Sequence, residues 1–299
     1  MCPVAIATSD VDSTFHRQAV ALGEMWKDNG LVDAVEPLFT SGSVENAQLV
    51  AARKATYAFM AANWLPLAAT GKGPFKEPLP VSLLTTINTG PLFFCSRADS
   101  KLSSFDDLKG KRVGLGHENS GMVQHIHTIF AALGIPLNWI EPVYCHTRPG
   151  NQMLIEGKID AQWQPPIPNI QFDDLNRQVP LKVLSFSSEQ RMRILEKVPY
   201  YAEVSIPKDA IRGIEHDTTE IAVVNILAVH AEDDEETVFR RTRAIIAHAD
   251  DLARRNPLYR GLDRLLVDSG KRIIPVLSKA GAPQHPGAAR AFREAGLAG

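Results

Sequence analysis

Short apolar runs alternate with helical patterns along this chain, and the alternation predicts the class of fold. Strands are expected over residues 4–7, 35–38, 56–61, 112–115, 140–144 and 161–163, and residues 92–96 are apolar and rich in phenylalanine. Helices are expected over residues 13–27, 44–53, 121–133 and 152–156. Strands that alternate with helices are typical of an α/β fold in which most strands run parallel.

The longest apolar run, EIAVVNILAVH over residues 220–230, indicates one further buried strand. A helix is expected after it, because four acidic residues from Asp233 precede a cluster of arginines, which suits the helix dipole. The pattern breaks near 87–91 and again near 214–219. Two such breaks predict that the chain crosses twice between two lobes. Lobe one is expected to comprise 1–88 plus 217–299, and lobe two 89–216.

Composition narrows the possible partners. The chain has 299 residues, of which 44% are hydrophobic and 22% charged, as in ordinary globular proteins. Its 32 basic and 34 acidic side chains nearly balance, which argues against a nucleic acid partner. Three cysteines, Cys2, Cys95 and Cys145, form no C-x-x-C pair. They allow at most one internal disulfide and leave the cellular compartment open.

Several motifs that carry chemistry are absent or incomplete. His125 and His127 lie two residues apart on an expected helix, so they do not share a face, and no metal site is expected. Gly114 and Gly116 match the first two glycines of the dinucleotide-binding motif G-x-G-x-x-G, but the third glycine is missing. No G-x-S-x-G motif occurs, and Cys145 is expected to be a buried structural cysteine with no catalytic role. No catalytic residue and no cofactor is therefore expected.

Two expected helices begin with a similar group of small polar residues. Ser41, Gly42 and Ser43 precede one, and Asn119, Ser120 and Gly121 precede the other. One capping side chain would be enough for a helix start. We expect Ser43 to cap the first helix while Ser41 donates outward, so that free N–H groups face a polar or anionic ligand. The alternative is that both groups are ordinary helix caps.

The chain resembles the TAXI family of solute receptors of TRAP transporters, the TRAP-associated extracytoplasmic immunogenic proteins. The matching segments keep the family's order: TSGSVEN at 40–46, RADS at 97–100, DLKGKRVGLG at 107–116, ENSG at 118–121, GKIDA at 157–161, PYY at 199–201 and HPGAARAFREAG at 285–296. The resemblance implies a type II, two-lobe periplasmic-binding-protein-like fold with a ligand cleft between the lobes. It also implies capture of a small solute, such as an amino acid, a dicarboxylate or a 2-oxoacid, for membrane permease subunits.

The resemblance and the helix starts together give the expected ligand-binding residues: Thr8, Ser9, Asp10, Ser13, Ser41, Gly42, Ser43, Asn46, Asn88, Asn119, Ser120, Gly121, Gln162 and Trp163. Some depart from the family pattern. Asp10 and Asp12 replace glycines, and His117 and Glu118 stand where small residues are common. A carboxylate in the cleft would repel an anionic solute unless a cation lay between them.

An enzyme on the same fold, such as a decarboxylase or desulfinase, is the alternative function, since a fold alone does not decide function. The N-terminal sequence shows no secretory signal. The protein is expected to be periplasmic if this chain lacks its native signal peptide, and cytoplasmic if residue 1 is the native start.

Overall fold

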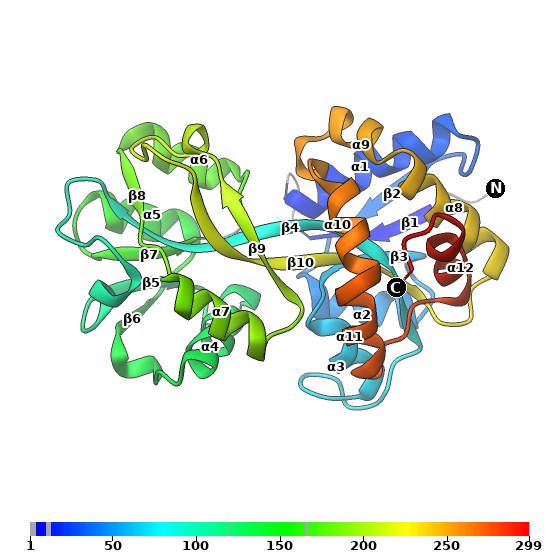
Figure 1. The fold of residues 1–299 in the computed structure, drawn as a ribbon, viewed down its shortest axis with the longest axis horizontal. Coiled ribbons are helices and arrows are strands. Elements are labelled where there is room, and N and C mark those ends of the chain that lie inside the picture. The colour runs from blue at the N-terminus through cyan, green and yellow to red at the C-terminus, as the bar shows by residue number, and fades with distance from the viewer. Residues whose placement is uncertain (1–3, 10–12, 119, 165–166, 299) are drawn as a thin grey trace. The chain divides into compact units, whose positions relative to one another are not determined.

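The computed structural model describes residues 4–9, 13–118, 120–164 and 167–298. The chain folds into two compact units (Figure 1). The first comprises residues up to Thr89 together with those from Val224 onward, and the second comprises Gly90–Val223. The second unit is thus one continuous stretch inserted into the first.

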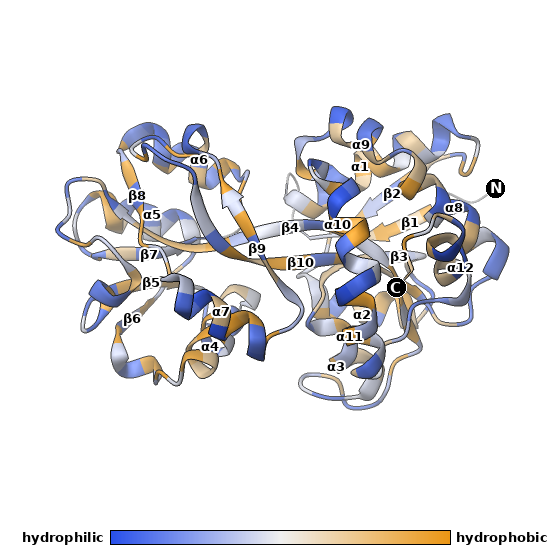
Figure 2. Ribbon diagram, viewed as in Figure 1, coloured by the Kyte–Doolittle hydropathy of each residue, from blue (hydrophilic) through white to orange (hydrophobic). Residues whose placement is uncertain are grey.

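The part of the sheet in the first unit has the strand order β2-β1-β3-β10-β4, where β4 contributes its residues up to Thr89. Strand β1 (Val4–Ala7) pairs in parallel with β2 (Val35–Leu38) and with β3 (Tyr57–Ala61). Strand β10 (Thr218–His230) runs antiparallel to β3 and places Asn225 opposite Ala61. β1 and β3 consist mainly of apolar residues, and Figure 2 colours β1 as hydrophobic.

Helices cover this sheet and bury its apolar side chains. They are α1 (Thr14–Asp28), α2 (Ser43–Ala51), α3 (Trp64–Thr70), α8 (Glu235–Ala247), α9 (Ala249–Arg255), α10 (Leu262–Asp268), α11 (Ile274–Lys279) and α12 (Pro286–Glu294). The buried Trp26 of α1 packs against Tyr57 with ring centroids 5.2 Å apart. Gly287 lets α12 lie directly on α8, because a Cβ there would fall 2.2 Å from the Glu235 carbonyl oxygen.

The second unit contains a mixed sheet. Strand β5 (Arg112–Gly116) pairs in parallel with β6 (Glu141–Tyr144) and β7 (Ala161–Gln164). Strand β4 (Val81–Arg97) runs antiparallel to β7 and to β8 (Leu181–Val183), and β9 (Tyr201–Ile206) runs antiparallel to β10. The expectation of mostly parallel strands is therefore wrong, because β4, β8, β9 and β10 all pair antiparallel.

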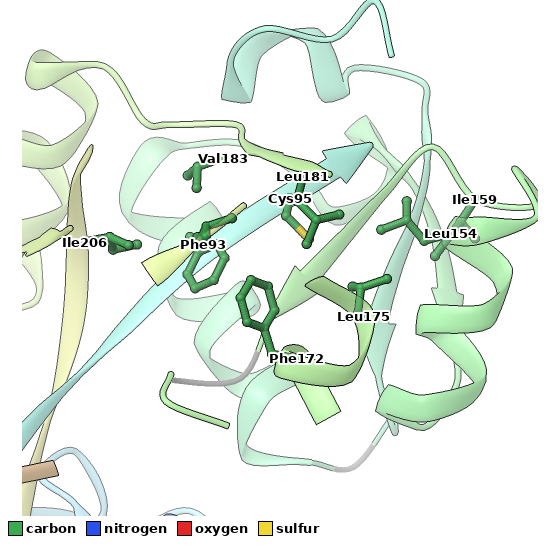
Figure 3. Packing of buried hydrophobic residues seen from close by; sticks show 10 residues of the cluster. Phe93, Cys95, Leu154, Ile159, Phe172, Leu175, Leu181, Val183 and Ile206 are labelled. Atoms are coloured by element: carbon green, nitrogen blue, oxygen red, sulfur yellow. The ribbon is translucent and has the colours of Figure 1, made fainter. Parts of the chain in front are cut away.

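Four helices pack on this second sheet: α4 (Gly121–Leu133), α5 (Thr147–Ile155), α6 (Ile170–Gln178) and α7 (Ser188–Lys197). Figure 3 shows part of the core beneath them, where Phe172 of α6 meets Phe93 of β4 edge to face at 5.6 Å. Leu154 and Ile159 extend the same buried cluster. In Figure 2 the outer helix α7 is largely hydrophilic, as expected for a helix that faces water on one side.

Two strands have residues in both units. Strand β4 is in the first unit up to Thr89 and in the second from Gly90, and β10 changes unit between Val223 and Val224. The apolar run at 92–96 thus lies within the second half of a strand of 17 residues. Residues 218–223 of β10 pair with β9 and belong to the second unit.

Candidate functional site

In the first unit, polar residues gather where the parallel strands end, which is where α/β proteins place their ligands. We call this group, Thr8, Ser9, Ser13, Thr40, Ser41, Gly42, Ser43 and Asn46, the first edge. The Thr8 hydroxyl donates to the Leu38 carbonyl oxygen at 2.8 Å and so ties the end of β1 to the end of β2. Ser9 donates to the hydroxyl of Ser13 at 2.7 Å. Ser13 in turn caps α1 by accepting the His16 N–H.

Asn46 is fully buried at the centre of the first edge. Its amide nitrogen donates to the carbonyl oxygens of Thr8 at 2.6 Å and Phe59 at 2.7 Å. Its amide oxygen lies 2.5 Å from the hydroxyl of Thr40. The polar atoms of Asn46 are therefore used to join the ends of β1 and β3 to α2.

The residues that lead into α2 do not have the roles that the sequence predicted. Gly42 is the N-cap, with a φ of 117° that favours glycine, and no side chain caps the helix. Ser41 donates both its N–H and its hydroxyl to the Glu45 carboxylate at 2.7 and 2.8 Å, which lowers the pKa of Glu45. Ser43 is the first helical residue, and its oxygen accepts the Ala61 N–H at 3.2 Å.

In the second unit, the equivalent group follows β5, β6 and β7, and we call it the second edge. It comprises His117, Glu118, Ser120, Gly121, Cys145, His146, Asn151, Gln162 and Gln164. Ser120 caps α4 by accepting the Val123 N–H at 3.3 Å, and Gly121 is the first, exposed residue of that helix. A Cβ on Gly121 would meet no atom within 4 Å, so open space surrounds it.

Three buried amide side chains of the second edge have an oxygen without a hydrogen-bond partner among the described residues: Asn151, Gln162 and Gln164. Each amide nitrogen has an acceptor. Gln162 donates to the Thr147 carbonyl oxygen, Asn151 to that of Gln171, and Gln164 to the sulfur of Cys95. Buried acceptors without a donor are costly, so these oxygens are candidate partners for water or for a donor on a ligand.

The other predicted residues either use their side chains in contacts with other parts of the chain or lie outside the described residues. Trp163 is buried, and its indole nitrogen donates to the Met122 carbonyl oxygen at 3.1 Å. Asn88 of β4 accepts a hydrogen bond from Asn225 of β10 at 3.3 Å. Asp10, Asp12 and Asn119 lie outside the described residues, so their expected place in the ligand site stays a prediction.

Cys145 and His146 begin the turn between β6 and α5. The N–H of Cys145 donates to the Gly116 carbonyl oxygen at 3.1 Å, which holds this turn against the end of β5. Burial raises the pKa of the Cys145 thiol. Because the thiolate is the nucleophile, this position is unfavourable for nucleophilic catalysis. The rings of His117 and His146 lie together, with centroids 5.1 Å apart.

The model of the NMT1-like family matches residues 6–296. The chain belongs to the NMT1-like family. The match covers both units and both edges.

Solved structures show the same fold over nearly the whole length of this NMT1-like protein. A putative periplasmic sulfonate-binding protein, SsuA from Methylobacillus flagellatus KT, is 14% identical, covers 100% of this chain and 96% of its own, and has a TM-score of 0.58. A TctC solute binding protein from Polaromonas is 18% identical, covers 88% of each chain and has a TM-score of 0.52. A protein from Xanthomonas citri with a bound chloride ion is 12% identical, covers 97% of this chain and 99% of its own, and has a TM-score of 0.52. The predicted α/β fold of periplasmic binding proteins is confirmed.

The second unit of the NMT1-like chain also contains a pocket of about 310 Å³, at the beginning of β5 and β7. Its lining includes the apolar Leu102, Leu154 and Ile159 and five charged residues: Arg97, Lys101, Lys111, Asp99 and Asp160. None of the predicted ligand residues lines it. Because it lies at the amino ends of the parallel strands, it is distinct from the second edge.

Two of the buried titratable residues in the second unit are Glu220 and His125, and of these only His125 was considered from the sequence, as one half of a metal pair. Glu220 of β10 is fully buried, and burial raises its pKa to about 7, although Ser185 and Arg191 lower it in part. His125 of α4 lies with its Nδ1 2.6 Å from the Tyr201 hydroxyl, and burial lowers its pKa to about 4. No helix among the described residues has the length and apolar character needed to cross a bilayer.

Proposed function

We propose that this protein is a solute-binding receptor of the TAXI type, which captures a small polar or acidic solute and passes it to a TRAP-type transporter. The observation that carries the proposal is the matched pair of edges, one in each unit, at the ends of the parallel strands. The likeness in fold to a putative sulfonate-binding protein over 100% of this chain, and to a TctC solute binding protein over 88% of it, supports it. The raised pKa of Cys145 speaks against the enzyme alternative.

Ser43 and Ser120 are the hydroxyls that we assign to solute binding. Each accepts one backbone N–H, from Ala61 and from Val123. A serine hydroxyl has one hydrogen to donate as well, and neither hydrogen has an acceptor among the described residues. Each unit thus presents a hydroxyl donor at a helix start, where an anionic or polar group is favoured. A solute that engages both would favour closure of the two lobes.

The first experiment is native mass spectrometry of the purified protein, which should show a small molecule bound to each chain. Calorimetry with that molecule then compares Ser43→Ala and Ser120→Ala with Ser187→Ala. Ser187 caps α7 by accepting the Gln190 N–H, but it follows β8, which is not among the parallel strands. We expect about a tenfold loss of affinity or more for the first two variants. Affinity should be unchanged for the third.

Two outcomes would contradict the proposal. If Ser43→Ala and Ser120→Ala bind as the unmodified protein does while remaining folded, these hydroxyls have no part in capture. If instead a bound compound is converted to product, and Cys145→Ser abolishes the conversion, the protein is an enzyme. Uptake of the solute into proteoliposomes that contain a TRAP permease, dependent on added receptor, tests the transport partner.

A further inference from the structure

The two imidazoles at the second edge are close enough for one metal ion to bind both. His117 follows β5 and His146 follows β6, and both side chains are exposed. Their ring centroids are 5.1 Å apart. Metal–nitrogen bonds of about 2.0–2.1 Å at a tetrahedral angle place two ligating imidazole centroids about 5 Å apart. The observed separation therefore matches that of two histidines bound to one ion.

Backbone contacts join the two segments that carry the histidines. Gly116 pairs with Tyr144 in the sheet, and the N–H of Cys145 donates to the Gly116 carbonyl oxygen at 3.1 Å. His117 and His146 are the next residues along each segment. The pair is thus formed by two segments 29 positions apart, and no local spacing in the sequence indicates it.

The set of protein ligands is incomplete. Within the described part of the chain, no group of three histidine, cysteine, aspartate or glutamate side chains could hold a metal ion. Structural zinc sites use four protein ligands and catalytic sites use three, so a site with two leaves at least two positions open. Small chelating molecules with carboxylate, amine or hydroxyl groups can fill such positions.

We propose that His117 and His146 bind a divalent transition-metal ion, such as Zn²⁺ or Ni²⁺, whose open positions are completed by a chelating solute. Imidazole is a preferred ligand of both ions. The proposal rests on the proposed function, because the solute that completes the site is the one that the receptor captures. The bound cation would also offset the charge of the neighbouring Glu118 when the solute is an acid. This pair differs from the pair tested in the sequence, His125 and His127, for which no metal site is expected.

The test is calorimetric titration of the protein, prepared without a polyhistidine tag, with Zn²⁺ alone and with Ni²⁺ alone. The control variant is His127→Ala, because His127 is an exposed histidine of the same unit, on α4. We expect one ion per chain in the unmodified protein and in His127→Ala. His117→Ala and His146→Ala should each bind at least tenfold more weakly, and circular dichroism should show that they remain folded.

The outcomes separate this proposal from the proposed function. If neither ion binds, or if His117→Ala and His146→Ala bind as tightly as His127→Ala, the metal proposal is wrong. Capture of a solute by metal-free protein in native mass spectrometry would likewise overturn the metal proposal, and would leave the receptor function intact. If the ion binds through both histidines but no solute is ever captured, the metal site stands and the role of the solute is wrong.

Discussion

The two edges are built from similar residue types, but their polar atoms are used differently. In the first edge, the buried Asn46 and Thr8 have hydrogen-bond partners from neighbouring strands. In the second edge, the buried amides of Asn151, Gln162 and Gln164 each have an oxygen without a donor among the described residues. The buried part of the first edge is therefore a completed network that holds its own fold together, and the Ser43 hydroxyl keeps its hydrogen for a ligand. The second has unused capacity for a ligand or for water.

A serine, glycine or asparagine at the end of a strand therefore does not by itself indicate ligand contact. What matters is whether its polar atoms already have partners within the unit. This comparison can be tested by replacing single side chains in the first edge and in the second edge and measuring the free energy of unfolding. The effects should be large in the first edge and small in the second.

The largest effect is expected for Asn46→Ala. This change removes two hydrogen bonds to carbonyl oxygens and leaves those of Thr8 and Phe59 buried without this donor. Each buried group that loses its partner costs about 1–3 kcal/mol, so the free energy of unfolding should fall by about 3 kcal/mol. Urea denaturation measures it. The control is Asn29→Ala, an exposed residue that loses one partly buried hydrogen bond to the Met25 carbonyl oxygen and should cost less than about 1 kcal/mol.

The second prediction concerns pH and the two buried titratable groups of the second unit. The pKa of Glu220 is raised from 4.5 to about 7, so its contribution to stability is complete below pH 4.5 and is lost as pH rises to about 7. The pKa of His125 is lowered from 6.5 to about 4, so its contribution is complete above pH 6.5 and is lost as pH falls to about 4. Each group contributes about 3 kcal/mol to the free energy of unfolding. Between pH 4.5 and 6.5 the two contributions change in opposite directions with pH, so they nearly cancel.

Substitution of either group should reveal the slope of the other. In Glu220→Gln, the free energy of unfolding should fall by about 3 kcal/mol, relative to the unmodified protein, as pH is lowered from 6.5 to 4. In His125→Gln, it should rise by about 3 kcal/mol as pH is lowered from 7 to 4.5. Urea denaturation at a series of pH values measures both, with the exposed Glu196→Gln as the control. If both variants keep the pH dependence of the unmodified protein, the two groups do not titrate as described.

The smallest effect on stability is expected for Gln164→Met in the second edge. The substitution removes an amide oxygen without a donor and only a weak hydrogen bond, of 3.4 Å, to the Cys95 sulfur. The side-chain volume is nearly unchanged, so the free energy of unfolding should change by less than about 1 kcal/mol. If Gln164→Met lowered the free energy of unfolding as much as Asn46→Ala, the second edge would also be a completed network. The proposed difference between the two edges would then be wrong.

Much of the fold could be predicted from the pattern of residues. The bounds of β1, β2 and α4 agree with the expected ranges. Helix α5 was expected to begin at residue 152, but it begins at Thr147. Pro149 lies in its first turn, where a missing N–H costs nothing. Gly150 lets the helix pack closely there, because a Cβ would lie 2.8 Å from the Gln162 nitrogen and 3.0 Å from the Cys145 sulfur and would force these side chains to shift. Contacts of this kind are not visible in a local pattern.

The candidate site was less predictable than the fold. The sequence predicted Ser43 as the N-cap of α2. Gly42 holds that position instead, and Ser43 accepts the N–H of Ala61, 18 residues away. The sequence also predicted that the amide of Asn46 is free to bind a ligand, but that amide joins strands that are far apart in the sequence. Which polar atoms remain free depends on partners brought together by folding. For this reason neither Asn151 nor the pair of His117 and His146 was predicted.

The insertion of the second unit into the first has a consequence for the order of events on the ribosome. The first unit needs β10 beside β3, and it needs α8 and α12, which come from the last part of the chain. The second unit is continuous and is fully synthesised once Val223 has emerged. Domains generally fold as units as they are made. We therefore expect the second unit to fold first. Until β10 is synthesised, the strands of the first unit that precede Gly90 lack a pairing partner and keep apolar side chains exposed. A chaperone would be needed most during this interval.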